Sequence, residues 1–367
     1  MNIEFDREQL LPALQMVVGV VERRQTLPIL SNLLLQVEPD TVTLTTTDLE
    51  VELTSRFANA SGVSQSVTLP AKKLFDICRA LPQGAEIRLQ VEDGKARLSS
   101  GRSRFTLATM SAEDFPNITD FTPTAELTLP SHTLRQLIED TQFAMAHQDV
   151  RYYLNGLLIE IADRTLRCVA TDGHRLAMAE TALDGQDGLE AIQIILPRKG
   201  VTELFRMLPD SDETVNLEFS GNHLRVTLGD QGMTSKLIDG KFPDYTGVIP
   251  AAATLRLGVE REPLRHALQR VSILSNEKFR GVRLSLGNDE LTVQAHNPEQ
   301  EEAEESLPVD HQGQEFEIGF NVNYLLDALS AIRTSHVEFV FTNPDSSALL
   351  LPVDDVTRKY VIMPMRL

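Results

Sequence analysis

The sequence predicts an α+β fold built from three repeated domains, each with two helices packed against antiparallel sheets. Three observations lead to this prediction. One helical segment occurs twice with closely matching residues, the strands around it recur in the same order, and a weaker third copy follows. A repeat of about 120 residues has the size of a domain, so the pattern indicates repeated domains rather than a solenoid of short units.

The repeated helical segment runs from Leu69 to Pro82 and again, 127 residues later, from Leu196 to Pro209. Each copy has proline at its second position, which is typical of a helix start. Lysine and arginine occupy one face, and apolar residues recur on the other at the spacing i, i+3, i+4, i+7. These apolar residues are Leu74, Ile77, Cys78 and Leu81 in the first copy and Val201, Leu204, Phe205 and Leu208 in the second.

A strand and a helix begin the chain and recur 124 residues later. Ile3 and Phe5 alternate as in a strand, Leu127 begins the second copy, and Leu257 begins the third. Short alternating strands with turn residues fill the remainder of each unit. We expect domains at residues 1–122, 123–250 and 251–367, and helices at Asp6–Gly19, Ala71–Ala80, Ser131–Ala144, Pro197–Leu208, Arg261–Leu274 and Asn321–Arg333.

The composition favours an acidic protein with reduced cysteines. Of the 367 residues, 42% are hydrophobic, enough for a core in each domain, and the net charge of −19 by itself argues against nucleic acid as a partner. Cys78 and Cys168 lie in apolar stretches, which indicates packed thiols in a cytoplasmic protein. The N-terminus lacks the pattern of a signal peptide, and no apolar run approaches the ~20 residues of a membrane helix.

The positive charge is concentrated in the predicted helices. Three of them, Ala71–Ala80, Pro197–Leu208 and Arg261–Leu274, are net basic in this acidic chain. If these helices face the same way, they could follow a polyanion without reading its sequence. Basic residues are also common on the wet face of an amphipathic helix, so both interpretations stay open. The candidate contacts in the twice-repeated helix are Lys72, Lys73, Arg79, Arg198, Lys199 and Arg206.

No catalytic motif stands out. The sequence lacks the glycine-rich phosphate-binding motifs and G-x-S-x-G, and its histidines lack the spacing of a zinc site, so no metal or cofactor is expected. The most site-like stretch is ATDGHRLAM, and an enzyme using Asp172, His174 and Arg175 is the alternative hypothesis. Asp172 has a counterpart in Asp48, which lacks such neighbours. An aspartate at the same repeat position favours a turn cap over catalysis.

The C-terminal stretch, Tyr360-Val-Ile-Met-Pro-Met-Arg-Leu, is largely apolar. Chain ends usually lie in water. We expect this one either to pack into a core or to form one wall of an apolar groove for a partner peptide. Methionine suits the second role because its side chain adapts to varied surfaces.

Together these features resemble a known family. The three repeats, with TLPILSNLLL, ATDGHRLA, AHQDVRYYLNG, NPEQEEAEE, FPDY and a terminal VIMPMRL, are similar to bacterial DNA polymerase III beta subunits, the sliding clamps, over essentially the whole chain. The resemblance implies a head-to-tail homodimer whose six domains form a ring around duplex DNA, with the helices lining the hole. It also implies a non-catalytic processivity factor that binds polymerase and clamp-loader subunits through short linear motifs.

The resemblance assigns residues to three surfaces. The DNA contacts carry over to Arg24, Lys72, Lys73, Gln148, Tyr152 and Tyr153. The partner groove carries over to Leu154, Thr171, Gly173, His174, Arg175, Leu176, Pro243, Val248, Ser347, Val361, Met363, Pro364, Met365 and Arg366. At the subunit joint, Phe105 and Leu107 would meet Ile273 and Leu274, and Glu301, Glu302 and Glu304 would face Lys73, Arg102 and Arg104.

Three further points bear on these assignments. The acidic run from Glu299 to Glu305 would by itself indicate a solvated loop or an edge strand, and the resemblance gives it a place at the joint. Gly247 stands where relatives often have arginine at the groove rim, so contacts from that edge would be weaker. Asn323, Tyr324 and Ser330 replace basic residues in the third copy of the helix, which predicts an unevenly charged hole.

Overall fold

The structure, a computed structural model, describes residues 2–22, 27–60, 62–118, 121–183, 190–250, 255–287, 289–311, 315–343 and 346–366. The chain divides into two compact units. One comprises Met1–Arg135 and Lys199–Leu237, and the other comprises Gln136–Arg198 and Ile238–Leu367. Each unit contains one large and one four-stranded sheet among its described residues.

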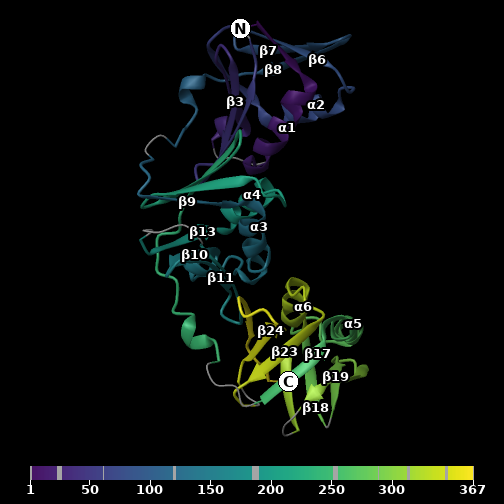
Figure 1. Cartoon of the computed structure of the whole chain (residues 1–367). Helices are drawn as coiled ribbons and strands as arrows, with labels where there is room; N and C mark the ends of the chain where they lie inside the picture. The colour runs from purple at the N-terminus through teal and green to yellow at the C-terminus, as the bar shows by residue number, and fades with distance from the viewer. Residues whose placement is uncertain are drawn as a thin grey trace. The chain divides into compact units, whose positions relative to one another are not determined.

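The first unit contains an eight-stranded sheet, ordered β5-β2-β3-β4-β16-β15-β14-β9, and a four-stranded sheet, ordered β1-β6-β7-β8 (Figure 1). The strands of the larger sheet are β2 (Asn32–Val37), β3 (Thr41–Thr47), β4 (Val51–Ala58), β5 (Gln65–Pro70), β9 (Ala125–Pro130), β14 (Thr214–Phe219), β15 (His223–Leu228) and β16 (Gln231–Lys236). Those of the smaller sheet are β1 (Asn2–Asp6), β6 (Glu86–Glu92), β7 (Lys95–Ser100) and β8 (Ser103–Ala108). Helix α1 (Arg7–Val17) contacts α2 (Ala71–Ala80), and most of α4 (Arg198–Met207) also belongs to this unit.

The second unit contains a nine-stranded sheet, ordered β13-β10-β11-β12-β25-β24-β23-β17-β21, and a four-stranded sheet, ordered β20-β19-β18-β22. The strands of the larger sheet are β10 (Gly156–Ala162), β11 (Thr165–Thr171), β12 (Arg175–Ala182), β13 (Ile192–Pro197), β17 (Leu255–Glu260), β21 (Asp310–His311), β23 (His336–Phe341), β24 (Ala348–Pro352) and β25 (Arg358–Ile362). Those of the smaller sheet are β18 (Gly281–Leu286), β19 (Glu290–His296), β20 (Glu302–Pro308) and β22 (Phe316–Asn321). Helix α5 (Arg261–Val271) contacts α6 (Val322–Ala331), and α3 (Ser131–Glu139) spans the division between the units.

The strand registers show the same repeat three times. In each copy of the repeat, the strand after the first helix pairs with the strand that precedes the second helix, and that second helix begins at the next residue. The paired residues are Asn32 with Pro70, Gly156 with Pro197, and Gly281 with Asn321. The predicted α+β fold of three repeated units is therefore confirmed.

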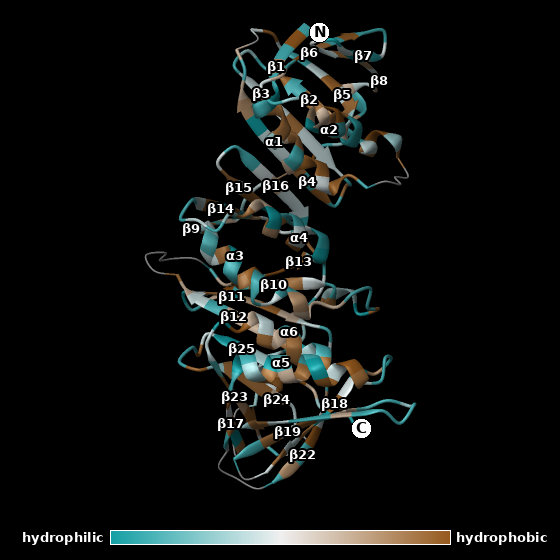
Figure 2. Ribbon diagram, turned by 90° about the vertical axis from the view of Figure 1, so that its right-hand side faces the viewer, coloured by the Kyte–Doolittle hydropathy of each residue, from teal (hydrophilic) through white to brown (hydrophobic). Residues whose placement is uncertain are grey.

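The helices lie close to their predicted ranges because each has a local apolar stripe. Leu74 and Cys78 of α2 and Val201 and Leu204 of α4 are fully buried, and Figure 2 shows hydrophobic and hydrophilic residues alternating along α5, as expected for an amphipathic helix. Two details of the prediction were wrong. Pro70 and Pro197 each precede their helix rather than start it, because each still forms the last pair of a strand, β5 or β13. The helix predicted at Ser131–Ala144 ends at Glu139, and a separate 3-10 turn follows at Gln142–Ala144.

Both cysteines are buried, free thiols, as predicted. Burial raises the pKa of Cys78 and of Cys168 to about 12, so neither thiol is a reactive nucleophile at neutral pH. Within the residues that the structure describes, no helix is long and apolar enough to cross a membrane.

Candidate functional site

The turn between β11 and β12 carries the stretch that looked most like a catalytic site. The Asp172 carboxylate accepts hydrogen bonds from the backbone N–H groups of His174 (2.9 Å) and Arg175 (3.0 Å), and Gly173 has a φ of +87° that suits glycine. Asp48 accepts from the backbone of Glu50 and Val51 in the same way. The predicted turn cap is confirmed, and this role gives the enzyme hypothesis no support.

Arg175 holds this turn against two other segments of the second unit. Its guanidinium donates to the Asp172 carboxylate (3.2 Å), to the Asp327 carboxylate on α6 and to the Phe143 carbonyl (2.8 Å). It also lies 4.5 Å from the centre of the Tyr324 ring, at cation–π distance. These contacts leave Arg175 largely buried and hold the turn after β11 in place.

A cavity of about 220 Å³ opens beside this turn. Its floor belongs to an apolar cluster that includes Leu158, Val169, Leu176 and Phe242, all buried. The lining residues are Arg151, Tyr153, Leu154, Thr171, Gly173, Arg175, Leu176, Pro243, Asp244, Tyr245, Val248, Val361 and Met363. An apolar pocket with a few polar groups at its rim is the usual form of a site for a short peptide segment.

Tyr245 is fixed in the cavity wall by a polar network on β10 to β13. Its hydroxyl donates to a Glu160 carboxylate oxygen (2.7 Å) and accepts from the Arg167 guanidinium (3.1 Å). Arg167 also forms ion pairs with Glu160 (2.6 Å) and Glu180 (2.7 Å). Burial and the Glu160 hydrogen bond raise the pKa of Tyr245 to about 12, so the phenol keeps its proton for the Glu160 hydrogen bond.

The C-terminal stretch fits both interpretations that the sequence left open. Tyr360, Val361 and Ile362 are buried in β25, which pairs with β12 on one side and with β24 on the other. Met363 is 43% exposed and lines the cavity, and its N–H donates to the His174 carbonyl (2.9 Å). The strand is thus a core element, and the methionine after it is a groove wall.

Nine of the predicted groove residues line this one cavity: Leu154, Thr171, Gly173, Arg175, Leu176, Pro243, Val248, Val361 and Met363. The other five do not: His174 stacks on the Tyr324 ring, Met365 and Arg366 line a different cavity, and Ser347 and Pro364 are partly buried elsewhere. Four lining residues were not predicted for the groove: Arg151, Tyr153, Asp244 and Tyr245. The FPDY motif contains two of these, and its tyrosine was the available signal.

The basic residues of α2 and α4 have different surroundings. Lys73 is exposed, and Lys72 is half-buried beside it. In α4, Lys199 forms ion pairs with Glu22 and Asp48, and Arg206 pairs with Glu203 and donates to the Met16 carbonyl. Burial alone would lower the pKa of Lys199, but the hydrogen bonds to Asp48 and Glu22 outweigh burial and raise it.

Two further arginines of the predicted DNA surface also have local contacts. Arg79 pairs with Asp76 one turn earlier (2.8 Å) and lies over the Phe75 ring. Arg198 donates to the Met145 carbonyl (3.2 Å). Arg24, the remaining basic residue of that surface, lies outside the described residues.

The loop from Gln148 to Tyr152 presents large side chains to solvent. Asn155 braces it through two hydrogen bonds with the backbone of Asp149, both 2.9 Å. Val150 is 96% exposed and Tyr152 is 56% exposed. Such exposure of apolar side chains on a braced loop is typical of a contact surface. Tyr153, predicted beside them as a DNA contact, also lines the apolar cavity.

Most of the residues predicted for a subunit joint lie on or beside two sheet edges, whereas Lys73 is in α2 and Ile273 and Leu274 are in a 3-10 helix after α5. Phe105 and Leu107 belong to β8, the edge strand of the small sheet in the first unit. Glu302 and Glu304 belong to β20, the edge of the small sheet in the second unit, with Glu301 just before it. Arg102, Arg104 and these glutamates are exposed, and Ile273 is 75% exposed while Leu274 is partly buried. The acidic run is therefore an edge strand, as one interpretation expected.

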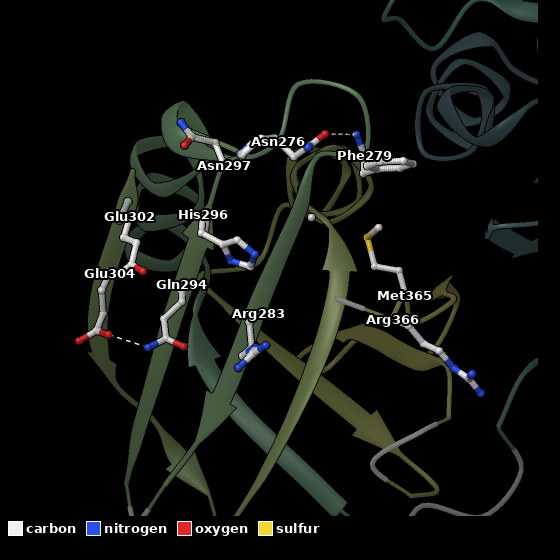
Figure 3. Close-up of a pocket in the computed structure, with 14 residues that line it drawn as sticks. Asn276, Phe279, Arg283, Gln294, His296, Asn297, Glu302, Glu304, Met365 and Arg366 are labelled. Carbon is white, nitrogen blue, oxygen red and sulfur yellow. Dashed lines mark hydrogen bonds between the residues drawn. The ribbon is translucent and has the colours of Figure 1, made fainter. Parts of the chain in front are cut away.

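A larger cavity, about 730 Å³, lies on the small sheet of the second unit. Figure 3 shows Arg283, Gln294 and His296 in its middle, with Glu302 and Glu304 at one end and Phe279 and Met365 at the other. Gln294 donates to the Glu304 carboxylate (2.6 Å). Four of its lining residues were predicted for other surfaces: Met365 and Arg366 for the partner groove, and Glu302 and Glu304 for the subunit joint.

Comparison with known proteins matches the whole chain to one family. Three family models match in order: DNA polymerase III beta subunit, N-terminal domain, at residues 1–119; its central domain at residues 128–244; and its C-terminal domain at residues 246–366. The curated beta sliding clamp of Pseudomonas aeruginosa is 50% identical over 369 residues, and that of Escherichia coli is 50% identical over 368, each comparison covering 100% of both chains.

Solved structures of the same kind are similar throughout. A crystal structure of the DNA polymerase sliding clamp from Pseudomonas aeruginosa with a ligand superposes with a TM-score of 0.97 at 49% identity, covering 100% of both chains. The Caulobacter crescentus beta sliding clamp superposes with a TM-score of 0.95 at 39% identity, covering 100% of this chain and 99% of that one. In that structure polyethylene glycol is bound to a putative beta-motif tethering region.

Proposed function

This chain belongs to the family of DNA polymerase III beta subunits, the sliding clamps, and from that premise we propose which of its surfaces close the ring, contact DNA and hold partners. A sliding clamp is a non-catalytic subunit that encircles duplex DNA and keeps the replicative polymerase on it. We assign the three domains to residues 1–122, 123–250 and 251–367, and the working location to the cytoplasm, in keeping with the two free, buried thiols.

The single observation that carries the ring assignment is a strand pairing that occurs twice within the chain. Strand β4 pairs with β16, where Leu53 opposes Met233, and β12 pairs with β25, where Ala177 opposes Tyr360. Both pairings join equivalent strands of successive copies. The strands at the same two positions of the repeat in the third and first copies are β20 and β8. Each is the edge of its sheet and pairs on that side with no strand of the residues that the structure describes. We assign these edges to each other across two copies of the chain.

The repeat also gives the register of that joint. Ala303 opposes Ala295 within its sheet as Leu53 opposes Thr46, and Phe105 opposes Leu98 as Met233 opposes Val226. Ala303 of one copy should therefore oppose Phe105 of the other.

In an antiparallel pair with this register, Glu304 would oppose Arg104, and Glu302 would oppose Thr106 with Arg104 diagonal to it. Glu305 is already bound to Arg270 through two hydrogen bonds of 2.6 and 2.7 Å. Glu301, Glu302 and Glu304 then remain for Lys73, Arg102 and Arg104, while Phe105 and Leu107 pack against Ile273 and Leu274. Exposed ion pairs of this kind contribute about 0–1 kcal/mol each, which suits a joint that a loader must open.

The DNA surface is assigned to the helices and to the loop before β10. Lys72 and Lys73 are the best candidates for phosphate contacts, because α4 uses Lys199 and Arg206 in ion pairs within the chain. Arg79, Arg198 and Arg24 complete the basic set, and Gln148, Tyr152 and Tyr153 are assigned to the loop contact. Contacts to phosphate alone carry no sequence information, so this surface would slide.

The cavity beside the Asp172 turn is assigned to partner peptides. Its apolar floor and about 220 Å³ of space suit one or two apolar side chains, such as a leucine and an aromatic residue of a short linear motif. Met363 supplies the adaptable wall. The remaining predicted residues, His174, Ser347, Pro364, Met365 and Arg366, would contact the motif where it extends beyond the cavity.

Retention on DNA tests the proposal. The protein should be loaded on a nicked circular duplex and followed by gel filtration before and after the circle is linearised. A ring slides off a free end, so we expect strong retention on the circle and rapid loss after cutting. Equal retention on both forms would contradict encirclement. His174→Ala serves as the control for the enzyme hypothesis, since it should change partner affinity and leave retention unchanged.

A further inference from the structure

The 730 Å³ cavity occupies the same place in the third copy of the repeat as the partner groove does in the second. Leu154 and Phe279 each lie two residues before the glycine that starts the paired strand, and each lines its cavity. Thr171, which pairs with Leu176, corresponds to His296, which pairs with Glu302. The two cavities are therefore repeat-related positions.

In the first two copies a connecting segment covers this face. Phe115 packs there with Ile29, Leu30 and Leu34, and Phe242 packs with Leu158 and its neighbours. The third copy begins the same path, because the Met365 N–H donates to the Gly319 carbonyl (2.8 Å) as the Ile238 N–H donates to the Ile195 carbonyl (2.9 Å). Phe279 is 56% exposed at the cavity rim.

The third face is also polar where the second is apolar. Arg283 stands at the position of Leu158, Gln294 at that of Val169, and Glu302 at that of Leu176. Arg283 has a single long, exposed ion pair with Glu317 (3.4 Å), which costs little to exchange for another carboxylate. The cavity thus suits a charged occupant rather than an apolar motif.

Formation of the proposed joint would determine whether the cavity favours a negative or a positive occupant. Glu302 and Glu304 line the cavity, and in the register given above Arg104 of the second copy lies opposite Glu304 and diagonal to Glu302, so it offsets one of their two negative charges. The cavity then keeps Arg283 and Arg366 as its cations and gains a wall from β8 of the second copy. In the partner groove, β25 supplies the equivalent wall through Val361.

We propose that this cavity, completed by β8 of the second copy, is a second docking site that accepts an acidic peptide segment carrying one aromatic residue. The aromatic ring packs on Phe279 and Met365, and the flanking carboxylates pair with Arg283 and Arg366. The connectors of the chain itself have this composition, since both Phe115 and Phe242 lie in Phe-Pro segments with an aspartate beside them. The proposal rests on the proposed dimer, and its site shares Met365 and Arg366 with the outer part of the proposed partner groove.

Two fluorescent decapeptides test it by anisotropy with the full-length dimer. One has a single phenylalanine-proline flanked by aspartates, and its control has lysines in place of the aspartates. We expect the acidic peptide alone to bind, with affinity reduced at least ten-fold by Arg283→Glu and by Phe279→Ala. Met363→Ala, which alters the partner groove, should leave this binding unchanged, and Arg283→Glu should leave binding of a leucine-aromatic motif peptide unchanged.

The state of the dimer separates this proposal from the proposed function. Ile273→Asp should split the dimer, as measured by analytical ultracentrifugation, and should also abolish binding of the acidic peptide. Binding of the acidic peptide that is unaffected by Arg283→Glu, or no binding to an intact dimer, would overturn the second site while leaving the clamp assignment in place. A wild-type chain that stays monomeric would contradict the proposed dimer itself.

Discussion

Asp172 and Arg175 belong to the same turn, but the sequence could predict the role of the first and not the contacts of the second. Asp172 caps its own turn, and the equivalent Asp48 made that role readable from sequence spacing. Arg175 binds Asp327 and the Phe143 carbonyl, which lie 152 and 32 residues away in the chain. No local sequence pattern predicts such partners, because they depend on how α6 and the segment after α3 pack against the turn. The same reason explains why Tyr245 was not predicted for the groove.

At Tyr245, the polar network gives a prediction about groove shape. Tyr245→Phe removes a single hydroxyl and leaves the ion pairs of Arg167 in place, so we expect a loss of about 1 kcal/mol in stability. Arg167→Met leaves Glu160 and Glu180 unpaired in a partly buried site and should cost about 3 kcal/mol. Urea unfolding measures both losses, and motif-peptide affinity should fall further in Arg167→Met. A larger loss in Tyr245→Phe would show that the hydroxyl, not the guanidinium, organises the wall.

The lowered pKa of His223 leads to a prediction of how the free energy of unfolding changes with pH. Burial, with the Lys236 and Arg225 cations, lowers its pKa in the folded state below the ordinary value of 6.5, although Glu50 acts in the opposite direction. The unfolded chain therefore binds a proton more readily, and the stability contributed by neutral His223 is lost as the pH falls below 6.5.

His223→Gln isolates this contribution, because glutamine does not titrate. Urea midpoints at pH 7.5 and pH 5.5 should differ more for the wild type than for the variant. An equal or larger difference in the variant would mean that other groups control the acid response.

At the scale of elements, the helices were predictable and the strand partners between copies were not. A helix can be predicted from the apolar stripe in its own sequence, such as the one that Leu74 and Cys78 form in α2. The pairing of β4 with β16 joins residues more than 170 positions apart. The alternation of apolar and polar residues within a strand does not predict which strand lies next to it. The repeat did predict that the units are equivalent, and the resemblance, rather than the alternation, pointed to β8 and β20 as a joint.

Helices α2 and α4 should respond differently to the loss of their lysines. Lys72→Ala with Lys73→Ala removes one half-buried and one exposed lysine, so we expect weaker retention on circular DNA and a salt slope smaller by about 2, with little change in stability. Lys199→Ala leaves the Asp48 and Glu22 carboxylates without their cation and should lower stability more than it lowers retention. Retention assays at several salt concentrations, together with urea unfolding, distinguish the two. The same salt slope for both variants would contradict the assignment.

At the scale of the whole molecule, two copies of the chain should be held together by a joint of a different character from its partner groove. The joint combines the exposed cations of and beside β8 with the exposed carboxylates of and beside β20. Its apolar contact comes mainly from Phe105, Ile273 and Leu274, because Leu107 is already largely buried within its own copy. Screening at high ionic strength weakens exposed ion pairs, whereas burial of an apolar side chain in the groove is far less sensitive to it. Salt should therefore open the dimer before it releases a motif peptide.

The charge reversal of one pair makes this prediction specific. Arg104→Glu places like charges opposite Glu304, so we expect the dimer dissociation constant to rise at least ten-fold at low salt and much less at 1 M salt, where the Debye length is about 3 Å. Adding Glu304→Arg restores opposite charges with their places exchanged and should recover most of the affinity, as a direct pair requires. Analytical ultracentrifugation of the two single variants and the double variant measures this coupling. A double variant as weak as Arg104→Glu would show that these residues do not face each other, and the register derived from the repeat would then be wrong even if the ring itself forms.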